Sequence, residues 1–172
     1  MRSRWRVFWA LLLALTCAQQ TPAQTKRARL PPVDTINHVQ LLEMVRRDSG
    51  KVHLINVWAT WCKPCREEIP TLLRLRRELR KRGFALTLVS ADDVEITDGK
   101  VKPMLRQFGV EFQTYIMQDV NDEAFIRGMS PDWSGALPTS FIYDKHGALV
   151  DMIVGEKKYE QFKAGLEKLL NR

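Results

Sequence analysis

Two cysteines separated by two residues, Cys62 and Cys65, are the side chains best suited to chemistry in this sequence. They follow an apolar run, residues 51–58, that predicts a buried strand, and they begin an amphipathic pattern, residues 63–82, that predicts a helix. Cys62 would then lie at the helix N-terminus, where free backbone N–H groups and the helix dipole favour a thiolate. Because a thiolate is the species that attacks disulfides, the pattern predicts redox chemistry.

A metal-binding role for this cysteine pair is the main alternative. A zinc or copper site would need further ligands, yet the remaining cysteine is Cys17 and the three histidines are scattered without ligand spacing. We therefore predict no metal ligands and no bound cofactor, while a metal-handling (copper) thiol module stays open as a function of another class. A peroxidase is not expected, because the threonine-bearing motif typical of one is missing ahead of Cys62.

The first 23 residues have the pattern of a secretory signal peptide. Arginines at positions 2, 4 and 6 precede an apolar run, residues 7–15, and small residues follow it. The run is shorter than the roughly 20 residues of a membrane span, but an uncleaved anchor and lipidation at Cys17 stay open. Residues 24–35 are predicted to be a flexible lead-in, and residues 36–172 a single domain. The expected location is extracytoplasmic or periplasmic, where an oxidising environment permits disulfides.

Composition narrows the possible partners. The 172 residues carry a formal net charge of +7, and three of the positive charges belong to the leader. The remainder shows no basic patch interleaved with aromatic residues, so we predict no nucleic-acid binding. A disulfide between Cys62 and Cys65 would enclose almost no chain and would add little loop-closure entropy. A catalytic role therefore explains the pair better than a stabilising one.

The rest of the chain alternates between helical and extended patterns. Strands are predicted at residues 84–90, 112–117, 139–143 and 148–154, and helices at residues 37–47, 102–108, 121–127 and 157–170. Residues 91–100 are predicted to be an acidic loop. This order predicts an α/β fold, with a central mixed β-sheet flanked by helices on both sides.

Three segments carry a family resemblance. Residues 56–65 (NVWATWCKPC), Pro70 and residues 135–139 (GALPT) resemble the thioredoxin-fold thiol–disulfide oxidoreductases, and among these the exported TlpA/ResA-like group. That group includes the reductases of cytochrome c maturation. The resemblance covers about residue 34 to the C-terminus. It implies a thioredoxin-like fold with an inserted helix–strand unit at about residues 101–117.

The resemblance implies four catalytic residues. Cys62 would be the nucleophile that forms a mixed disulfide with substrate, and Cys65 the thiol that resolves it. Pro138 would be a cis-proline next to the pair. Glu68, one helical turn after Cys65, would raise the thiol pKa and shuttle a proton. Thioredoxin itself has a buried acid where Asn56 stands here, so acid–base chemistry would fall to Glu68 or water.

The substrate-binding residues implied by the resemblance surround the same turn. They are Trp61, Lys63, Pro64 and Leu137. The backbone of Leu137 would pair with an extended substrate segment, and Trp61 would line the docking groove. Lys63 would stabilise a thiolate by Coulomb attraction whereas Glu68 would oppose it, so the sequence leaves the redox poise undecided.

The predicted function is an exported dithiol reductase of protein disulfides, with apocytochrome c as one candidate substrate. Its partners would be disulfide-containing proteins and a membrane electron-donor protein that re-reduces the pair. A disulfide-forming oxidase with the same fold stays an alternative, because reduction potentials of such proteins range from about −270 to about −120 mV.

Overall fold

A computed structural model describes residues 30–118 and 123–172 of the chain. The predicted leader and residues 24–29 of the predicted lead-in lie outside these ranges. Within them, no helix combines the length and apolar character needed to cross a membrane.

The centre of the molecule is a six-stranded mixed β-sheet with the strand order β1-β4-β3-β2-β5-β6. The first four strands in this order run parallel, while β5 pairs antiparallel with β2 and β6 pairs antiparallel with β5. This confirms the mixed sheet that the sequence predicts. The strands are β1 (Val33–Ile36), β2 (Val52–Trp58), β3 (Phe84–Ser90), β4 (Thr114–Met117), β5 (Thr139–Tyr143) and β6 (Leu149–Val154).

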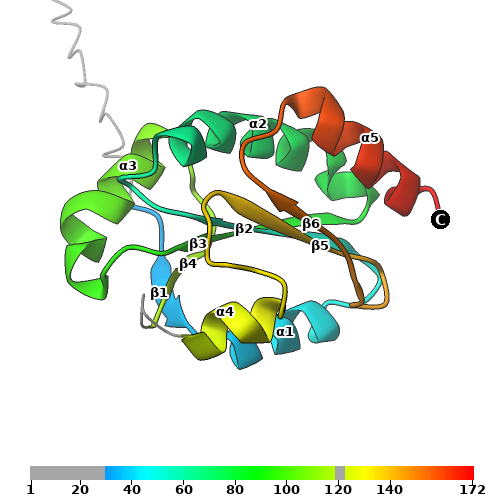
Figure 1. The fold of residues 1–172 in the computed structure, drawn as a ribbon. Helices are drawn as coiled ribbons and strands as arrows, with labels where there is room; N and C mark the ends of the chain where they lie inside the picture. The colour runs from blue at the N-terminus through cyan, green and yellow to red at the C-terminus, as the bar shows by residue number, and fades with distance from the viewer. Residues whose placement is uncertain (1–29, 119–122) are drawn as a thin grey trace, which may run out of the picture.

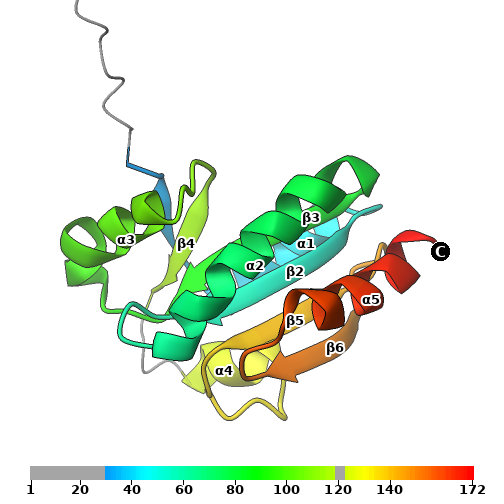
Figure 2. The same cartoon turned by 90° about the horizontal axis from the view of Figure 1, so that it is seen from above.

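Helices cover both faces of the sheet (Figure 1). α2, α3 and α5 lie on one face, and α1 and α4 lie together on the other. Viewed from above, α2 crosses β2 and β3 with α5 beside it, and α3 lies next to β4 (Figure 2). The helices are α1 (His38–Arg47), α2 (Lys63–Leu79), α3 (Lys102–Gln107), α4 (Glu123–Met129) and α5 (Tyr159–Leu170).

Strand β2 is the most deeply buried strand of the sheet. All seven of its residues are buried, because β3 and β5 pair with its two edges and helices cover both its faces. The nearly continuous apolar sequence of residues 51–58 reflects this two-sided burial. Since β2 ends at Trp58, a rigid core element carries the chain directly to the cysteine turn.

Helix α2 begins and ends at clear sequence signals. Cys62 is its N-cap, and Pro64 fits the first turn, where its missing N–H has no helical partner. An inward stripe that includes Ile69, Leu72 and Leu75 is buried against the sheet. After a short 3₁₀ turn the chain leaves the helix at Gly83, whose φ of +87° favours glycine.

Three predictions about the elements need correction. Residues 33–36, partly placed in the flexible lead-in, form β1, because this short strand gains a parallel partner in β4. The predicted acidic loop contains two short helical segments, Val94–Ile96 and Thr97–Val101, that run into α3. The helix predicted at residues 121–127 extends to Met129, and its first predicted residues lie outside the described ranges.

Candidate active site

The two cysteines lie at the junction between the end of β2 and the start of α2. They form a disulfide with a Cα–Cα distance of 5.3 Å. Cys65 is fully buried, and Cys62 is 5% exposed. As the N-cap, the Cys62 sulfur accepts a hydrogen bond from the Cys65 backbone N–H at 3.3 Å. The predicted position of Cys62 at the positive end of a helix is confirmed, and this position favours negative charge on its sulfur.

Glu68 is buried one turn further along α2, with 2% of its surface exposed. The Asn56 side-chain amide donates to one carboxylate oxygen at 2.9 Å, and the Lys157 backbone N–H donates to the other at 2.8 Å. Burial raises the pKa of Glu68 from 4.5 to about 7, because desolvation of the charged form outweighs these two hydrogen bonds. Glu68 can therefore both take up and release a proton near neutral pH.

A second buried carboxylate, Asp92, holds the turn before Cys62. The Thr60 backbone N–H and hydroxyl donate to its two oxygens at 2.9 and 2.6 Å, and the Ser90 hydroxyl donates at 2.6 Å. On the other side, the Arg66 guanidinium donates to the Thr60 carbonyl at 3.2 Å. Thr60 is thus fixed from both β3 and α2. These contacts limit the freedom of the turn that carries Trp61 and Cys62.

Sequence reasoning missed Asp92. An acidic residue two positions after the end of the apolar strand β3 was the available signal, because carboxyl ends of neighbouring parallel strands meet at one edge of a sheet. The sequence pattern around it predicts only an acidic loop.

Pro138 lies in the loop directly ahead of β5. The Leu137–Pro138 peptide bond is cis, as the resemblance implies. Trp133 supports this loop: its indole N–H donates to the Ala136 carbonyl and the Thr139 hydroxyl, both at 3.1 Å. Among the described residues, neither backbone group of Leu137 has a hydrogen-bond partner. Leu137 therefore offers a free donor and a free acceptor.

A hollow of about 350 Å³ lies beside the cysteine turn. Trp61 and Leu137 line it together with Ile96, and Asp92 and Asp93 add acidic groups. Trp61 is 68% exposed, which is unusual for so large an aromatic side chain. The structure thus brings two of the four predicted substrate-binding residues to one depression.

The other two predicted substrate-binding residues lie on the outer surface of the helix start. Lys63 and Pro64 are both exposed. The Lys63 ammonium lies 3.7 Å from the Glu67 carboxylate, an exposed ion pair. Part of the positive charge that Lys63 would direct at a thiolate is therefore offset by Glu67.

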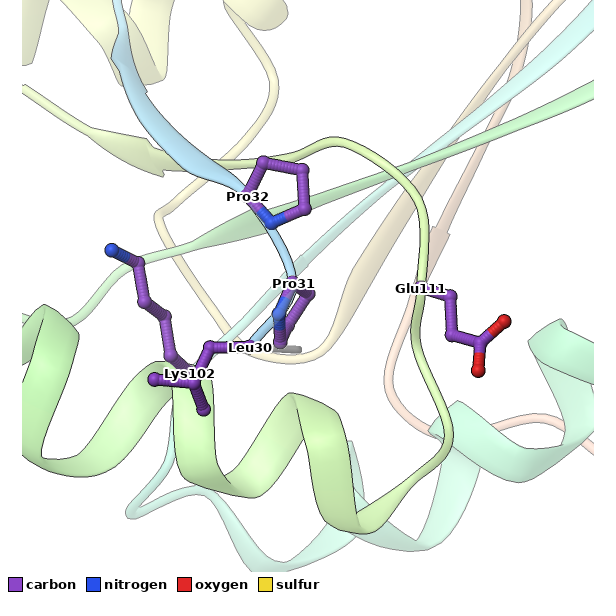
Figure 3. Close-up of a pocket in the computed structure, with 5 residues that line it drawn as sticks. All are labelled: Leu30, Pro31, Pro32, Lys102 and Glu111. Atoms are coloured by element: carbon purple, nitrogen blue, oxygen red, sulfur yellow. The ribbon is translucent and has the colours of Figure 1, made fainter. Parts of the chain in front are cut away.

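A larger hollow, about 540 Å³, lies at the entry to β1, away from the cysteines (Figure 3). Lys102 and Glu111 line it but point in different directions, and the Lys102 ammonium pairs with Asp98 at 2.6 Å. None of the predicted site residues lines this hollow. In the described part of the chain, no three His, Cys, Asp or Glu side chains are grouped so that they could hold a metal ion.

The sequence matches the family model described as AhpC/TSA over residues 20–152. The chain belongs to the AhpC/TSA family. Its sequence is 35% identical over 121 residues to the thiol-disulfide oxidoreductase ResA of Bacillus thuringiensis (strain Al Hakam). It is 31% identical over 116 residues to the thioredoxin-like protein YneN of Bacillus subtilis (strain 168). The predicted resemblance to ResA-type proteins is confirmed.

These alignments do not span the relatives completely. They cover 70% of this chain and 64% of ResA, and 65% of this chain and 63% of YneN.

Solved structures that resemble this chain confirm its thioredoxin-like fold. A thiol:disulfide interchange protein of the thioredoxin family from Chlorobium tepidum TLS matches with a TM-score of 0.61 and 24% identity, over 83% of this chain and 98% of that one. A secreted thiol-disulfide isomerase from Corynebacterium glutamicum matches with a TM-score of 0.61 and 18% identity, over 72% and 73%.

Replacing Glu68 by glutamine should flatten the pH dependence of stability. Its folded-state pKa of about 7 exceeds 4.5, so the folded protein holds this proton more tightly than the unfolded chain. The unfolding free energy should therefore fall by about 3 kcal/mol as the pH rises from about 4.5 to 7, and Glu68→Gln should lose this decrease. Urea unfolding at several pH values measures it. The control is Glu67→Gln, an exposed neighbour, which should keep the wild-type slope.

Replacing Asp92 by asparagine should destabilise the fold by about 2 kcal/mol. The Thr60 and Ser90 groups that donate to the carboxylate would then face an amide NH₂ group, which cannot accept their hydrogen bonds. The matched control is Asp93→Asn, which is exposed and should change stability by less than about 0.5 kcal/mol. Urea midpoints compare the two. Equal midpoints for both variants would show that the contacts to Thr60 and Ser90 add nothing.

Proposed function

We propose that this protein is an exported thiol–disulfide oxidoreductase that reduces disulfide bonds in other proteins. The observation that carries the proposal is the pairing of a cysteine N-cap with a buried, proton-exchanging carboxylate: Cys62 and Cys65 begin α2, and Glu68 lies one turn behind them. The name of ResA, a thiol-disulfide oxidoreductase, supports thiol–disulfide chemistry at this pair.

The reaction begins with the reduced pair. The Cys62 thiolate attacks one sulfur of a substrate disulfide and forms a mixed disulfide, and the second substrate sulfur leaves as a thiolate. Cys62 suits this role because its sulfur accepts the Cys65 N–H and lies at the positive end of α2.

The second step releases the substrate. Glu68 takes the proton of the Cys65 thiol, and the resulting thiolate attacks the Cys62 sulfur. The bond between Cys62 and the substrate breaks, the Cys62–Cys65 disulfide forms, and the substrate leaves with two electrons gained. A group with a pKa of about 7 is suited to this transfer, because both of its protonation states are populated at neutral pH.

The different exposure of Lys63 and Glu68, whose charges act on the thiolates in opposite ways, supports the reducing direction. Lys63 is exposed, and Glu67 offsets its charge, so its attraction for a thiolate is screened by water. Glu68 is buried, where a negative charge acts more strongly on its surroundings. Of these two side chains Glu68 therefore has the larger effect, which is to disfavour thiolates and to make the reduced pair a better electron donor.

Substrate binding is proposed at the cis-proline loop. The free N–H and carbonyl of Leu137 would pair with an extended segment of the substrate, as a strand adds to a sheet edge. Trp61 would cover one side of that segment. Pro138 would keep the loop against the cysteines, while Lys63 and Pro64 would form the outer rim of the contact.

The setting proposed for this reaction is outside the cytoplasm. The leader pattern of residues 1–23 supports export. A reductase in an oxidising compartment needs a membrane protein that returns electrons to Cys62 and Cys65. Cytochrome c maturation, with an apocytochrome as substrate, is the process we propose for it.

Cysteine variants test the order of the two steps. Cys62→Ala should reduce insulin only at the background rate, because no nucleophile remains. Cys65→Ala should accumulate a mixed disulfide with substrate through Cys62, visible on non-reducing gels and by mass spectrometry. The double variant Cys62→Ala/Cys65→Ala is the control and should trap nothing. Full activity in Cys62→Ala would falsify the proposed mechanism.

The reduction potential tests the direction of electron flow. A value near about −270 mV supports a reductase, and one near about −120 mV supports the oxidase instead. At pH 8, Glu68→Gln should raise the potential by about 30 mV, the equivalent of about 1.4 kcal/mol, because a charge that opposes the thiolate is removed. At about pH 5 the difference should vanish, since Glu68 is then protonated. Glu67→Gln should not show this pH-dependent difference.

A further inference from the structure

The hollow beside the cysteine turn combines two kinds of surface. Trp61, Ile96 and Leu137 give it an apolar side, and Asp93 gives it an exposed carboxylate. Its volume of about 350 Å³ is at the lower end of the range for small-ligand sites, about 300–1,000 Å³. It therefore suits a single side chain better than a large ligand.

The charges around this hollow are unbalanced. Asp92 and Asp93 line it, and no basic residue does. Asp92 is satisfied by Thr60 and Ser90. Asp93, in contrast, has no ion-pair partner within 4 Å in residues 30–118 and 123–172. The nearby Arg66 donates to the Thr60 carbonyl instead.

We propose that this hollow binds a lysine or arginine side chain of the substrate, next to the disulfide that is reduced. A basic side chain has a long apolar stem and a charged end, which match the apolar side of the hollow and Asp93. Its charged end can also approach the exposed ring of Trp61 as a cation–π contact.

The hollow lies next to the backbone groups that we propose bind the substrate. It includes Leu137, whose free backbone groups would pair with an extended segment. In such pairing, alternate side chains point to the same side, so backbone contacts give affinity and a pocket for one side chain gives selectivity. The basic residue would thus lie within a few positions of the attacked cysteine. This inference rests on the proposed function and adds a substrate class to it.

Peptide binding to the oxidised protein tests the inference without electron transfer. Three fluorescein-labelled peptides would differ only at one residue, lysine, methionine or glutamate, beside a serine that replaces the cysteine. Fluorescence anisotropy should show the lysine peptide binding about two- to fivefold more tightly than the methionine peptide, the range of an exposed ion pair. The glutamate peptide should bind most weakly. The lysine preference should shrink in about 0.5 M NaCl.

Two variants distinguish a specific contact with Asp93 from an effect of the protein's net charge. Asp93→Asn should abolish the preference for lysine over methionine. Asp151→Asn, an exposed residue on β6 that does not line the hollow, makes the same change in net charge and should keep the preference. Equal affinity for all three peptides, a preference that survives Asp93→Asn, or equal losses in both variants would each overturn the proposal.

Reduction assays distinguish this inference from the proposed function. With disulfide versions of the same peptides, the reduced protein should react faster with the lysine peptide. If the protein reduces all peptides at one rate, the redox function stands and the basic-residue preference is overturned. If binding shows the lysine preference but no peptide is reduced, the preference stands and the proposed reductase function fails.

Discussion

The burial of β2 on both faces is the constraint on which the site depends. Strand β2 lies between β3 and β5, all seven of its residues are buried, and it cannot shift without exposing apolar side chains. Because this strand ends at Trp58, the cysteine turn begins from a fixed point. Asp92 then extends this rigidity across the turn, through Thr60, to the first residues of α2.

The same arrangement buries the cysteine pair and the carboxyl group that follows it on α2. Asn56 on β2 and the backbone N–H of Lys157 bind the two oxygens of the buried Glu68 carboxylate, so this group is desolvated one helical turn after Cys65. Trp61 and the hollow that it lines, in contrast, are open to solvent. In the proposed mechanism a buried group handles the proton and an exposed surface meets the substrate, and Leu137 of the cis-proline loop lines that exposed surface.

The sequence was sufficient for features that depend on local order. The strand and the cysteine N-cap follow from spacing along residues 51–82, and the structure has both, whereas the burial of Glu68 does not follow from that spacing. It was insufficient where distant segments meet. β1 exists because β4 pairs with it, and Asp92 matters because parallel register brings the end of β3 to Thr60. The competition between Lys63 and Glu68 likewise needed their exposure, which spacing alone does not give.

The distribution of charge along α2 reveals a compromise between stability and chemistry. Its first turn has no acidic residue and begins with Lys63, whereas its last turn carries Arg76 and Arg77. Basic groups stabilise a helix C-terminus, but an acidic residue at the N-terminus would add about 0.3–1 kcal/mol that α2 does without. An acid there would also repel electron density on Cys62. The helix therefore gives up stability at the end where the sulfur benefits from an uncompensated positive pole.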